Sequence, residues 1–312
     1  MRVVFLGTPV WAAAYLTAIQ QAGSEIVLVV SQPDRRRSRG RKLQPTPVKQ
    51  AALELGLTVM QPEQVNSDAA VARIRATEPE LLLTVAYGQI LGKRLLEVPK
   101  LGALNVHYSL LPELRGPAPV QHALLEGLER TGVTLQEMAE QVDAGDILAQ
   151  QATAIEPDDN ADTLCRKLTE VGTAMVAAAL PELAAGELLS RPQNHAAATY
   201  APLLTKADTQ LDFTQSAEAV RNRIRAFAPT PGAYCLLQGR RLKITAAEIV
   251  NDSSQAAGEP GTIVEINSDS GPVIKTGEGL LLVKRVQPAG RREMEAAEWL
   301  RGARIEAGTV LS

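Results

Sequence analysis

The sequence predicts an α/β protein in two parts, with a parallel, helix-covered sheet first and a small antiparallel barrel or sandwich after it. In the first part, short valine-rich apolar runs alternate with segments of helical periodicity. From residue 207 onward, several short strand candidates follow one another with turns between them. A hydrophobic content of 45% and a charged content of 21% are typical of a folded globular chain.

Strand and helix candidates alternate in the first part. The strands are expected at 2–6, 25–30, 57–60, 81–85 and 103–107, and the helices at 9–23, 46–55, 67–76 and 117–127. Such alternation favours parallel pairing, because each helix returns the chain to the same end of the sheet. Ligands of open parallel sheets bind at the carboxyl ends of the strands.

The pattern changes after residue 130. Two extended segments are expected at 131–138 and 145–155, with a polar loop between them. A long helix rich in alanine and leucine is expected over 161–186. We expect these elements to complete a first domain over 1–189.

The stretch 190–206 is expected to link two domains. It lacks periodicity and contains Pro192 and Pro202. The second domain, over 207–312, holds the strand candidates GAYCLL, RRLKITAAEIV, GTIVEI, GPVIKT and GLLLVKRVQ. So many short strands within roughly 80 residues indicate a small barrel or sandwich.

Composition excludes several functional classes. The net charge of -3 argues against a general polyanion binder, which is usually strongly basic. The two cysteines lie far apart and the three histidines are scattered, so neither a disulfide framework nor a metal site is expected. The first residues lack a signal-peptide core and no apolar run reaches membrane-spanning length. We therefore expect a cytoplasmic protein with no membrane partner, and nothing in the sequence requires more than a monomer.

The glycine turn at 7–9 is the first candidate for a ligand site. It follows a strand, but it lacks the later glycines of a dinucleotide fingerprint, and no phosphate-binding GxxxxGK[ST] loop occurs. The turn therefore favours a simple connection from strand to helix. No serine or cysteine lies in a recognisable nucleophile motif.

Two polar residues end the strand expected at 103–107. Asn105 and His107 are two positions apart, so an extended backbone directs both side chains to one face. That face lies at the edge where an open sheet binds ligands. The pair either caps the strand or donates hydrogen bonds to a carbonyl oxygen that gains charge during attack. Spacing alone leaves both interpretations open.

A pair of carboxylates follows further along the chain. Asp143 and Asp146 flank Gly145, and this composition is typical of a tight turn. A carboxylate close to His107 would have a second role, because it would orient the imidazole and favour its charged form. Each aspartate taken alone favours the turn.

Basic residues gather between positions 35 and 49. They are Arg35, Arg36, Arg37, Arg39, Arg41, Lys42 and Lys49. A charge run is commonly a solvated loop, but this one follows the second strand and so emerges at the ligand-binding edge, where arginines can bind phosphates. In the second domain, Arg240 and Arg241 either face a nucleic acid or only keep the surface soluble.

Together, these motifs resemble the folate-dependent formyltransferases. The order N-x-H-x-S-L-L-P at 105–112, then R-G at 115–116, then D-x-G-D at 143–146, is similar to the pattern of that family. The likeness to members that act on methionine carried by initiator tRNA covers nearly the whole chain. It includes FLGTP, the basic segment, RIRAFAPTPGAY and VQPAGRREM. Tyr108, Phe213 and Thr230 depart from the residues common there, and Tyr108 is expected to alter the pocket wall.

The resemblance implies a reaction and its participants. A Rossmann-like catalytic domain and an OB-like β-barrel would transfer the formyl group of 10-formyltetrahydrofolate, a co-substrate, to the α-amino group of initiator Met-tRNA without a metal. The catalytic residues would be Asn105, His107 and Asp143. The folate pocket would use Ser109, Leu110, Leu111, Pro112, Gln89, Ile90 and Leu91. The tRNA contacts would be Arg35, Arg36, Arg37, Arg39, Arg41, Lys42, Arg240 and Arg241.

Three other functions compete with this interpretation. A formyltransferase for a small amine would share the N-x-H and aspartate motifs but would not need the basic segment or the barrel. A formyltetrahydrofolate hydrolase would use water as the acceptor. A non-catalytic RNA-binding module is disfavoured, because aromatic residues are only 3% of the chain.

Overall fold

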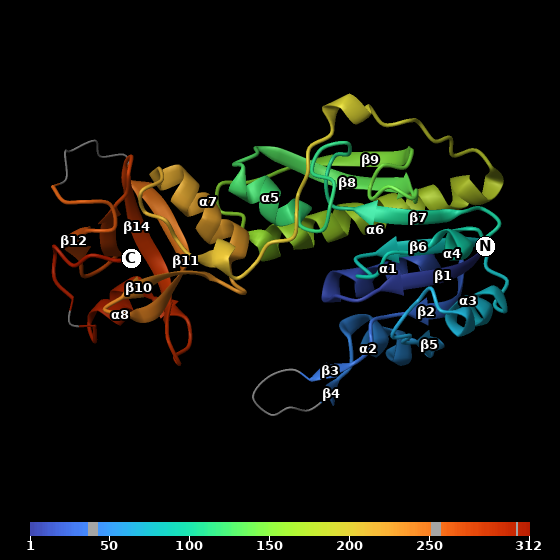
Figure 1. Ribbon diagram of the computed structural model, residues 1–312, viewed down its shortest axis with the longest axis horizontal. Helices are drawn as coiled ribbons and strands as arrows, with labels where there is room; N and C mark the ends of the chain where they lie inside the picture. Colours follow the sequence, from blue (N-terminus) through green and yellow to red (C-terminus); the bar gives the residue numbers. More distant parts are fainter. Residues whose placement is uncertain (37–42, 251–256, 304) are drawn as a thin grey trace. The chain divides into compact units, whose positions relative to one another are not determined.

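A computed structural model describes residues 1–36, 43–250, 257–303 and 305–312. The chain divides into two compact units (Figure 1). The first unit comprises Met1–Pro117, Thr131–Ala154 and Cys165–Ala201. The second unit comprises Ala118–Arg130, Ile155–Leu164 and Pro202–Ser312. Each unit therefore uses stretches that are separated in sequence. The domain boundaries expected from the sequence stay a prediction.

The first unit contains a seven-stranded sheet in the order β5-β2-β1-β6-β7-β8-β9. Its strands are β1 (Arg2–Gly7), β2 (Glu25–Val30), β5 (Val59–Met60), β6 (Leu81–Val85), β7 (Ala103–His107), β8 (Arg130–Glu137) and β9 (Ile147–Ala154). Neighbouring strands from β5 to β7 pair in parallel, as the alternating pattern predicted. The Rossmann-like fold class is thus confirmed.

Strand β8 runs antiparallel to β7, so the sheet is mixed. The register pairs Leu104 with Glu137 and His107 with Thr134. The turn after β8 consequently starts beside the beginning of β7, where the N–H of Met138 donates to the carbonyl of Ala103 at 2.8 Å. From there the chain runs back along the sheet until Asp143 contacts the Asn105 side chain of β7.

Helices and short elements complete the first unit. They are α1 (Val10–Gln21), α2 (Pro47–Glu54), α3 (Asp68–Arg75), α4 (Lys93–Leu96), most of α6 (Ala161–Ala185), η1 (His195–Ala197) and the two-residue strands β3 (Arg35–Arg36) and β4 (Leu43–Gln44). Thr46 and Ser67 cap α2 and α3 by accepting backbone N–H groups with their hydroxyls. Val4 and Leu6 of β1 share a buried cluster with Ile74 of α3.

Helix α6 is long and apolar enough to cross a membrane by length and composition, and it is the one such helix among the described residues. The sequence had indicated no apolar run of that length. Core helices of soluble proteins meet the same criteria. A Cβ at Gly172 would lie 3.3 Å from a methyl group of Val133, so the helix passes close to β8. The absence of a membrane partner stays a prediction.

The second unit contains a six-stranded antiparallel sheet in the order β10-β11-β14-β13-β12, with β15 on β14. Its elements are α5 (Pro119–Leu125), η2 (Ala207–Thr209), α7 (Ala217–Phe227), β10 (Ala233–Leu237), β11 (Arg240–Val250), β12 (Ile263–Asn267), β13 (Gly271–Lys275), β14 (Leu280–Pro288), β15 (Met294–Glu295) and α8 (Ala296–Leu300). The segment 308–312 bonds to Ile263 at one end of the sheet and to Leu236 at the other. This segment closes the sheet into the expected barrel.

Candidate active site

Asn105 lies on β7 with its amide held by the neighbouring strand. The hydroxyl of Thr84 on β6 donates to Asn105 Oδ1 at 2.8 Å. On its other side the amide donates from Nδ2 to Asp143 Oδ1 at 3.3 Å, and because a carboxylate only accepts, this contact assigns the nitrogen and leaves the oxygen toward Thr84. The distance is long for a hydrogen bond. Asn105 Nδ2 therefore retains donor capacity for a ligand.

Asp143 is the centre of the group. Its Oδ1 accepts from Gln136 Nε2 at 2.8 Å, and its Oδ2 accepts from the backbone N–H of Gly116 at 2.9 Å. The side chain is only 11% exposed. A carboxylate with this little solvent needs such donors, because burial without them is costly. The turn interpretation and the catalytic interpretation are both compatible with this position.

His107 is buried beside this carboxylate. Its Nε2 lies 2.9 Å from the carbonyl oxygen of Leu114, and a carbonyl only accepts, so Nε2 carries a proton. Its Nδ1 lies 3.6 Å from Asp143 Oδ2, which is ion-pair range but too long for a hydrogen bond. A neutral His107 therefore has an unprotonated Nδ1. Only the imidazolium can donate from that nitrogen, toward Asp143 or a ligand.

Three non-glycine residues around the site have left-handed backbones. The φ angles are +47° at Ala86, +56° at Leu114 and +52° at Asp143. Such conformations cost about 1–3 kcal/mol each and persist only when the surrounding structure enforces them. They set the course of the loops that hold His107 and carry the Asp143 carboxylate.

A cavity of about 190 Å³ opens beside Asn105 and Asp143. Its walls are Thr84, Ala86, Tyr87, Gly88, Gln89, Ile90, Leu91, Asn105, Gln136, Glu137, Met138, Ala139, Glu140, Val142 and Asp143. The loop after β6 thus supplies Gln89, Ile90 and Leu91, three of the residues expected to contact folate. The hydroxyl of Thr8, in the glycine turn, donates to the carbonyl of Tyr87 at 2.7 Å and supports that loop.

The other four residues expected at the folate pocket do not line this cavity. Ser109 and Leu111 are buried, and the Ser109 hydroxyl donates to the carbonyl of Glu113 at 2.5 Å. Leu110 and Pro112 are half-buried in the same loop. That loop leads to Leu114 and Gly116, so its backbone contacts His107 and Asp143. Contact between these side chains and folate stays a prediction.

Tyr108 faces away from the cavity. Its hydroxyl lies 3.0 Å from the hydroxyl of Thr169 on α6 and 3.3 Å from that of Tyr15 on α1. The expected effect of Tyr108 on the pocket wall has no support in this arrangement, because Tyr108 is absent from the cavity lining.

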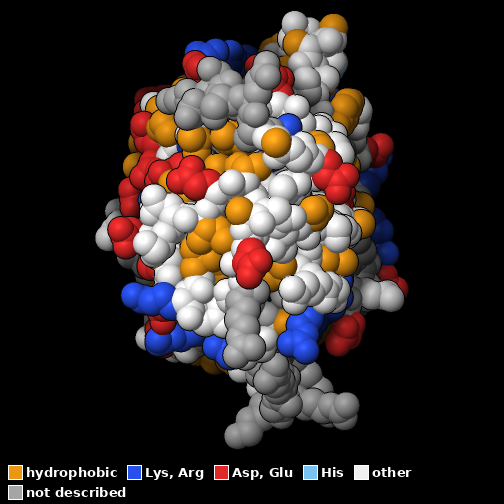
Figure 2. All heavy atoms as spheres, turned by 90° about the vertical axis from the view of Figure 1, so that its left-hand side faces the viewer, with side chains coloured by type: hydrophobic (Ala, Val, Ile, Leu, Met, Phe, Trp, Pro, Cys, Tyr) orange, Lys and Arg blue, Asp and Glu red, His pale blue; other side chains and the backbone are white. Residues whose placement is uncertain are grey.

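The residues expected to contact tRNA lie in two regions. Arg35 is exposed on β3, beside Arg36, whereas Arg37, Arg39, Arg41 and Lys42 lie outside the described residues. Arg240 and Arg241 are exposed at the start of β11, and the Arg241 guanidinium lies 4.4 Å from the ring centre of Tyr234. On the face that Figure 2 shows, basic side chains occur in separate groups between acidic and uncharged ones.

Several residues of the site escaped the sequence analysis. Thr84 and Gln136 were read as ordinary strand positions, and Gly116 contributes only its backbone N–H. Gln193 belongs to the stretch expected to be a linker, yet it is 5% exposed and contacts the Asp143 turn. The one available signal was the alternation of β8, which places Gln136 on the same face as Thr134.

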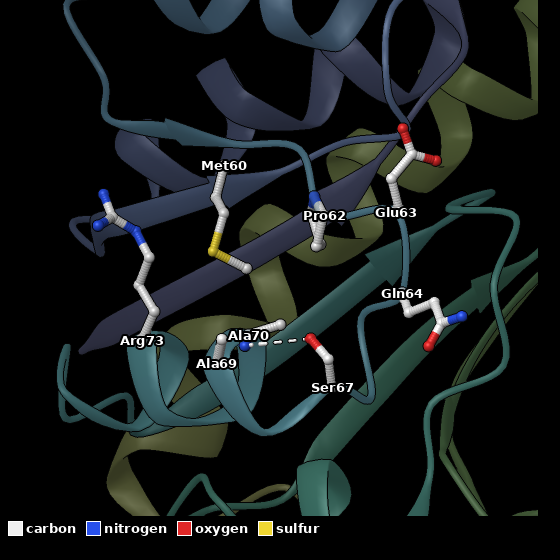
Figure 3. Close-up of a pocket in the computed structure, with 8 residues that line it drawn as sticks. All are labelled: Met60, Pro62, Glu63, Gln64, Ser67, Ala69, Ala70 and Arg73. Atoms are coloured by element: carbon white, nitrogen blue, oxygen red, sulfur yellow. Dashed lines mark hydrogen bonds between the residues drawn. The ribbon is translucent and has the colours of Figure 1, made fainter.

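A second hollow, of about 460 Å³, shares no lining residue with the first cavity, but Gln89 Nε2 donates to the carbonyls of Pro62 and Glu63 in its wall at 3.3 Å each (Figure 3). Met60, Pro62, Glu63 and Gln64 line it from β5 and the following loop, and Ser67, Ala69, Ala70 and Arg73 line it from the start of α3. It contains none of the predicted site residues. No cluster of three or more potential metal-binding side chains occurs in the part of the chain described.

Comparison with known families identifies the family of this chain. The formyl transferase family matches residues 1–180, and the C-terminal domain of formyl transferases matches residues 203–304. A methionyl-tRNA formyltransferase from Bacillus licheniformis is 43% identical over 311 residues, which are 99% of this chain and 98% of that protein. The chain belongs to the methionyl-tRNA formyltransferase family. The prediction made from the motifs is thereby confirmed, and the protein is an enzyme of the formyltransferase class.

Other relatives and solved structures extend the comparison. A methionyl-tRNA formyltransferase from Halorhodospira halophila is 45% identical, covering 98% of each chain. WlaRD, a sugar 3N-formyl transferase, has the same fold with a TM-score of 0.66 and 16% identity, over 94% of this chain and 99% of that one. HypX from Aquifex aeolicus, solved with tetrahydrofolic acid, matches with a TM-score of 0.64 and 19% identity, over 96% of this chain and 47% of that one. This chain therefore spans about half the length of HypX.

Proposed function

We propose that this protein transfers the formyl group of 10-formyltetrahydrofolate to the α-amino group of methionine on initiator Met-tRNA. The names of its relatives support the reaction and the acceptor. The tetrahydrofolic acid complex of HypX, a protein of the same fold, supports the donor. The observation that carries the proposal is the group formed by Asn105, His107 and Asp143 beside the cavity.

The chemistry requires no nucleophile from the enzyme. An α-amino group has a pKa of about 8, so a neutral amine is available near pH 7. Its nitrogen bonds to the formyl carbon, the bond from that carbon to N10 of the folate breaks, and the proton lost by the amine ends on N10. Positioning of the two substrates and stabilisation of the intermediate oxyanion lower the barrier.

Asn105 and His107 are proposed as the donors to that oxyanion. Asn105 Nδ2 has donor capacity beyond its long contact with Asp143. The Leu114 carbonyl fixes the proton of His107 on Nε2, so Nδ1 donates only when the ring is an imidazolium. The Asp143 carboxylate lies 3.6 Å from Nδ1 and passes the proton from the amine to N10 through water.

Substrate contacts follow from the same arrangement. Folate would enter the cavity lined by Gln89, Ile90 and Leu91, with the 109–112 loop at its side. The acceptor end of the tRNA would meet the basic segment that begins at Arg35. Arg240 and Arg241, with Tyr234 beneath the latter, would bind its phosphates. A cytoplasmic monomer is part of the proposal.

One assay tests the function. The protein is incubated with formyl-labelled 10-formyltetrahydrofolate and, in separate reactions, charged initiator tRNA, charged elongator tRNA, free methionine or water alone. We expect label only on the methionine of initiator tRNA. Label on free methionine would indicate a small-amine formyltransferase, and release of formate without acceptor would indicate a hydrolase. Either result would overturn the proposal.

A further inference from the structure

Gln193 lies in the stretch where the sequence indicated only a linker, yet that stretch is fixed at two places. Arg191 and Ile147 exchange backbone hydrogen bonds of 2.9 and 2.8 Å, which attach the segment to the start of β9. Further on, the Arg115 N–H donates to the carbonyl of Thr199 at 2.9 Å. Gln193 is therefore held between β9 and the loop that follows the SLLP motif.

All polar groups of the Gln193 side chain are used inside the protein. Its Nε2 donates to the carbonyl of Gly145 at 2.6 Å and to that of Asp143 at 3.0 Å. Its Oε1 accepts from Arg115 Nη2 at 2.6 Å and from Arg115 Nε at 3.2 Å. The side chain is 5% exposed. The side chain therefore links two loops by hydrogen bonds inside the protein and is not available at the surface.

The turn held by Nε2 has an uncommon backbone conformation and packs closely against β8. Asp143 is left-handed, and a Cβ on Gly145 would lie 1.9 Å from the carbonyl oxygen of Glu137. Both carbonyls of this turn point toward Gln193, and a buried carbonyl that loses its donor costs about 1–3 kcal/mol. Removing Nε2 would therefore let the turn shift, and the Asp143 carboxylate would shift with it.

The other half of the bridge reaches the same carboxylate. Arg115 is 2% exposed, and its Nη2 also donates to His195 Nδ1 at 2.9 Å. The next residue, Gly116, gives its N–H to Asp143 Oδ2 at 2.9 Å. Gln193 thus joins the backbone that carries Asp143 to the loop that binds its carboxylate.

We propose that Gln193 is a positioning residue for formyl transfer, which holds the Asp143 carboxylate in register with Asn105 and His107. The inference rests on the role proposed above for Asp143. Misplacement of a reacting group by about 1 Å can cost on the order of 10²-fold in rate. We expect Gln193→Ala to lower kcat at least about tenfold and to leave KM for each substrate within about twofold.

Two further variants define what Gln193 contributes. Gln193→Glu keeps an oxygen for Arg115 but presents no N–H to the two carbonyls, so we expect it to be as slow as Gln193→Ala. Asn222→Ala is the matched control, because Asn222 is also a buried amide whose oxygen accepts from an arginine, at 2.7 Å from Arg225. We expect the control to lose stability in thermal unfolding and to keep its kcat. A wild-type kcat in Gln193→Glu would overturn the inference.

A double-mutant cycle separates positioning from general destabilisation. If Gln193 acts through Asp143, then adding Gln193→Ala to Asp143→Ala changes the single-turnover rate less than about twofold. Equal effects in both backgrounds would show a structural role only and would overturn the inference. If Gln193→Ala has a normal rate and Asp143→Ala is impaired, the inference about Gln193 is overturned but the proposed role of Asp143 is not. A normal rate for Asp143→Ala overturns the proposed role of Asp143 and the inference with it.

Discussion

Two polar groups lie on opposite sides of the end of β7, and they differ in how completely their hydrogen bonds are satisfied. On one side, Asn105 and His107 meet Asp143 beside a cavity. On the other side, Tyr108 meets Tyr15 and Thr169 in the interior. His107 ends β7 and Tyr108 is the first residue after it, so two consecutive residues enter two different environments.

The interior group is closed. Thr169 donates its hydroxyl to the carbonyl of Cys165 at 2.7 Å, so it accepts from Tyr108, which in turn accepts from Tyr15. The group beside the cavity is open, because Asn105 Nδ2 has one long contact among the described residues and His107 Nδ1 has no hydrogen bond at all there. Unused donor capacity beside the cavity therefore belongs to the Asn105 amide, whereas His107 Nδ1 can donate only as an imidazolium.

The largest effect is expected from the open group. Asn105→Ala and His107→Ala each remove one proposed oxyanion donor, which typically costs on the order of 10²–10³ in kcat. Formylation under single-turnover conditions measures this, and circular dichroism verifies the fold. Tyr108→Phe, from the closed group, is the matched control. Near-normal turnover in either alanine variant would falsify the assignment.

The next largest effect is expected on tRNA binding, at a residue that belongs to neither the open nor the closed group. Arg39 lies outside the described residues, within the basic segment expected to bind tRNA. Loss of a charge-assisted phosphate contact costs about 1.5–3 kcal/mol, so Arg39→Ala should raise KM for tRNA roughly tenfold or more. The salt dependence of tRNA affinity should also weaken by about one phosphate contact. Arg73→Ala, on α3, is the control, and an equal loss of folate affinity would contradict the prediction.

A smaller effect on kcat is expected at Thr84, the β6 residue that contacts the Asn105 amide. Thr84→Val keeps the shape of the side chain but removes the donor that orients the Asn105 amide. With its amide free to turn, Asn105 should donate less often, and we expect kcat to fall about tenfold. Thr84→Ser should restore most of the rate because it restores the hydroxyl. Equal rates for the valine variant and the wild type would show that Thr84 does not orient Asn105.

Tyr108→Phe should separate stability from activity. Loss of its hydroxyl removes hydrogen bonds to Thr169 and Tyr15, so the free energy of unfolding should fall by about 1 kcal/mol. Denaturant unfolding measures that change. The formylation rate should stay within about twofold of wild type, since the hydroxyl faces away from the cavity. A large rate loss in a folded variant would show that the two groups are coupled.

The closed group also predicts a response to alkali, with no effect at neutral pH. Burial raises the pKa of Tyr15, and it raises the pKa of Tyr108 despite its hydrogen bonds with Thr169 and Tyr15, which oppose the shift. A raised folded-state pKa contributes stability that is fully present below about pH 10 and is lost as the pH rises further. Absorbance titration at alkaline pH should show both tyrosines ionising only as the protein unfolds. Ionisation of either in folded protein would contradict this.

The elements of the fold were largely predictable because their signals are local. Strands 2–6 and 25–30 lie within the observed β1 and β2, since valine-rich apolar runs fit a doubly covered sheet. The antiparallel direction of β8 was not predictable. Strand direction depends on the path of the connection between β7 and β8, and that path has no local pattern in the sequence. That reversal sets the route by which the Asp143 turn reaches Asn105.

The site was predictable only in part, for a related reason. Asn105 and His107 share a strand, so alternation was enough to place them together. Asp143 could be placed only through a motif. Gln193 lies in no motif, because it binds backbone carbonyls, and every residue type has a backbone carbonyl. Tyr108 was expected at the pocket wall, but it follows the last residue of β7 and its hydroxyl contacts Tyr15 and Thr169 instead.

The left-handed backbones of Ala86, Leu114 and Asp143 carry a consequence for engineering heat resistance. Glycine adopts such conformations without steric cost, so Ala86→Gly or Leu114→Gly would release strain held in the folded state. It would also give the unfolded chain more freedom and give the loops more room to move. At such positions stability and activity oppose each other, because the backbone strain that lowers the stability of the folded protein also accompanies a fixed loop conformation.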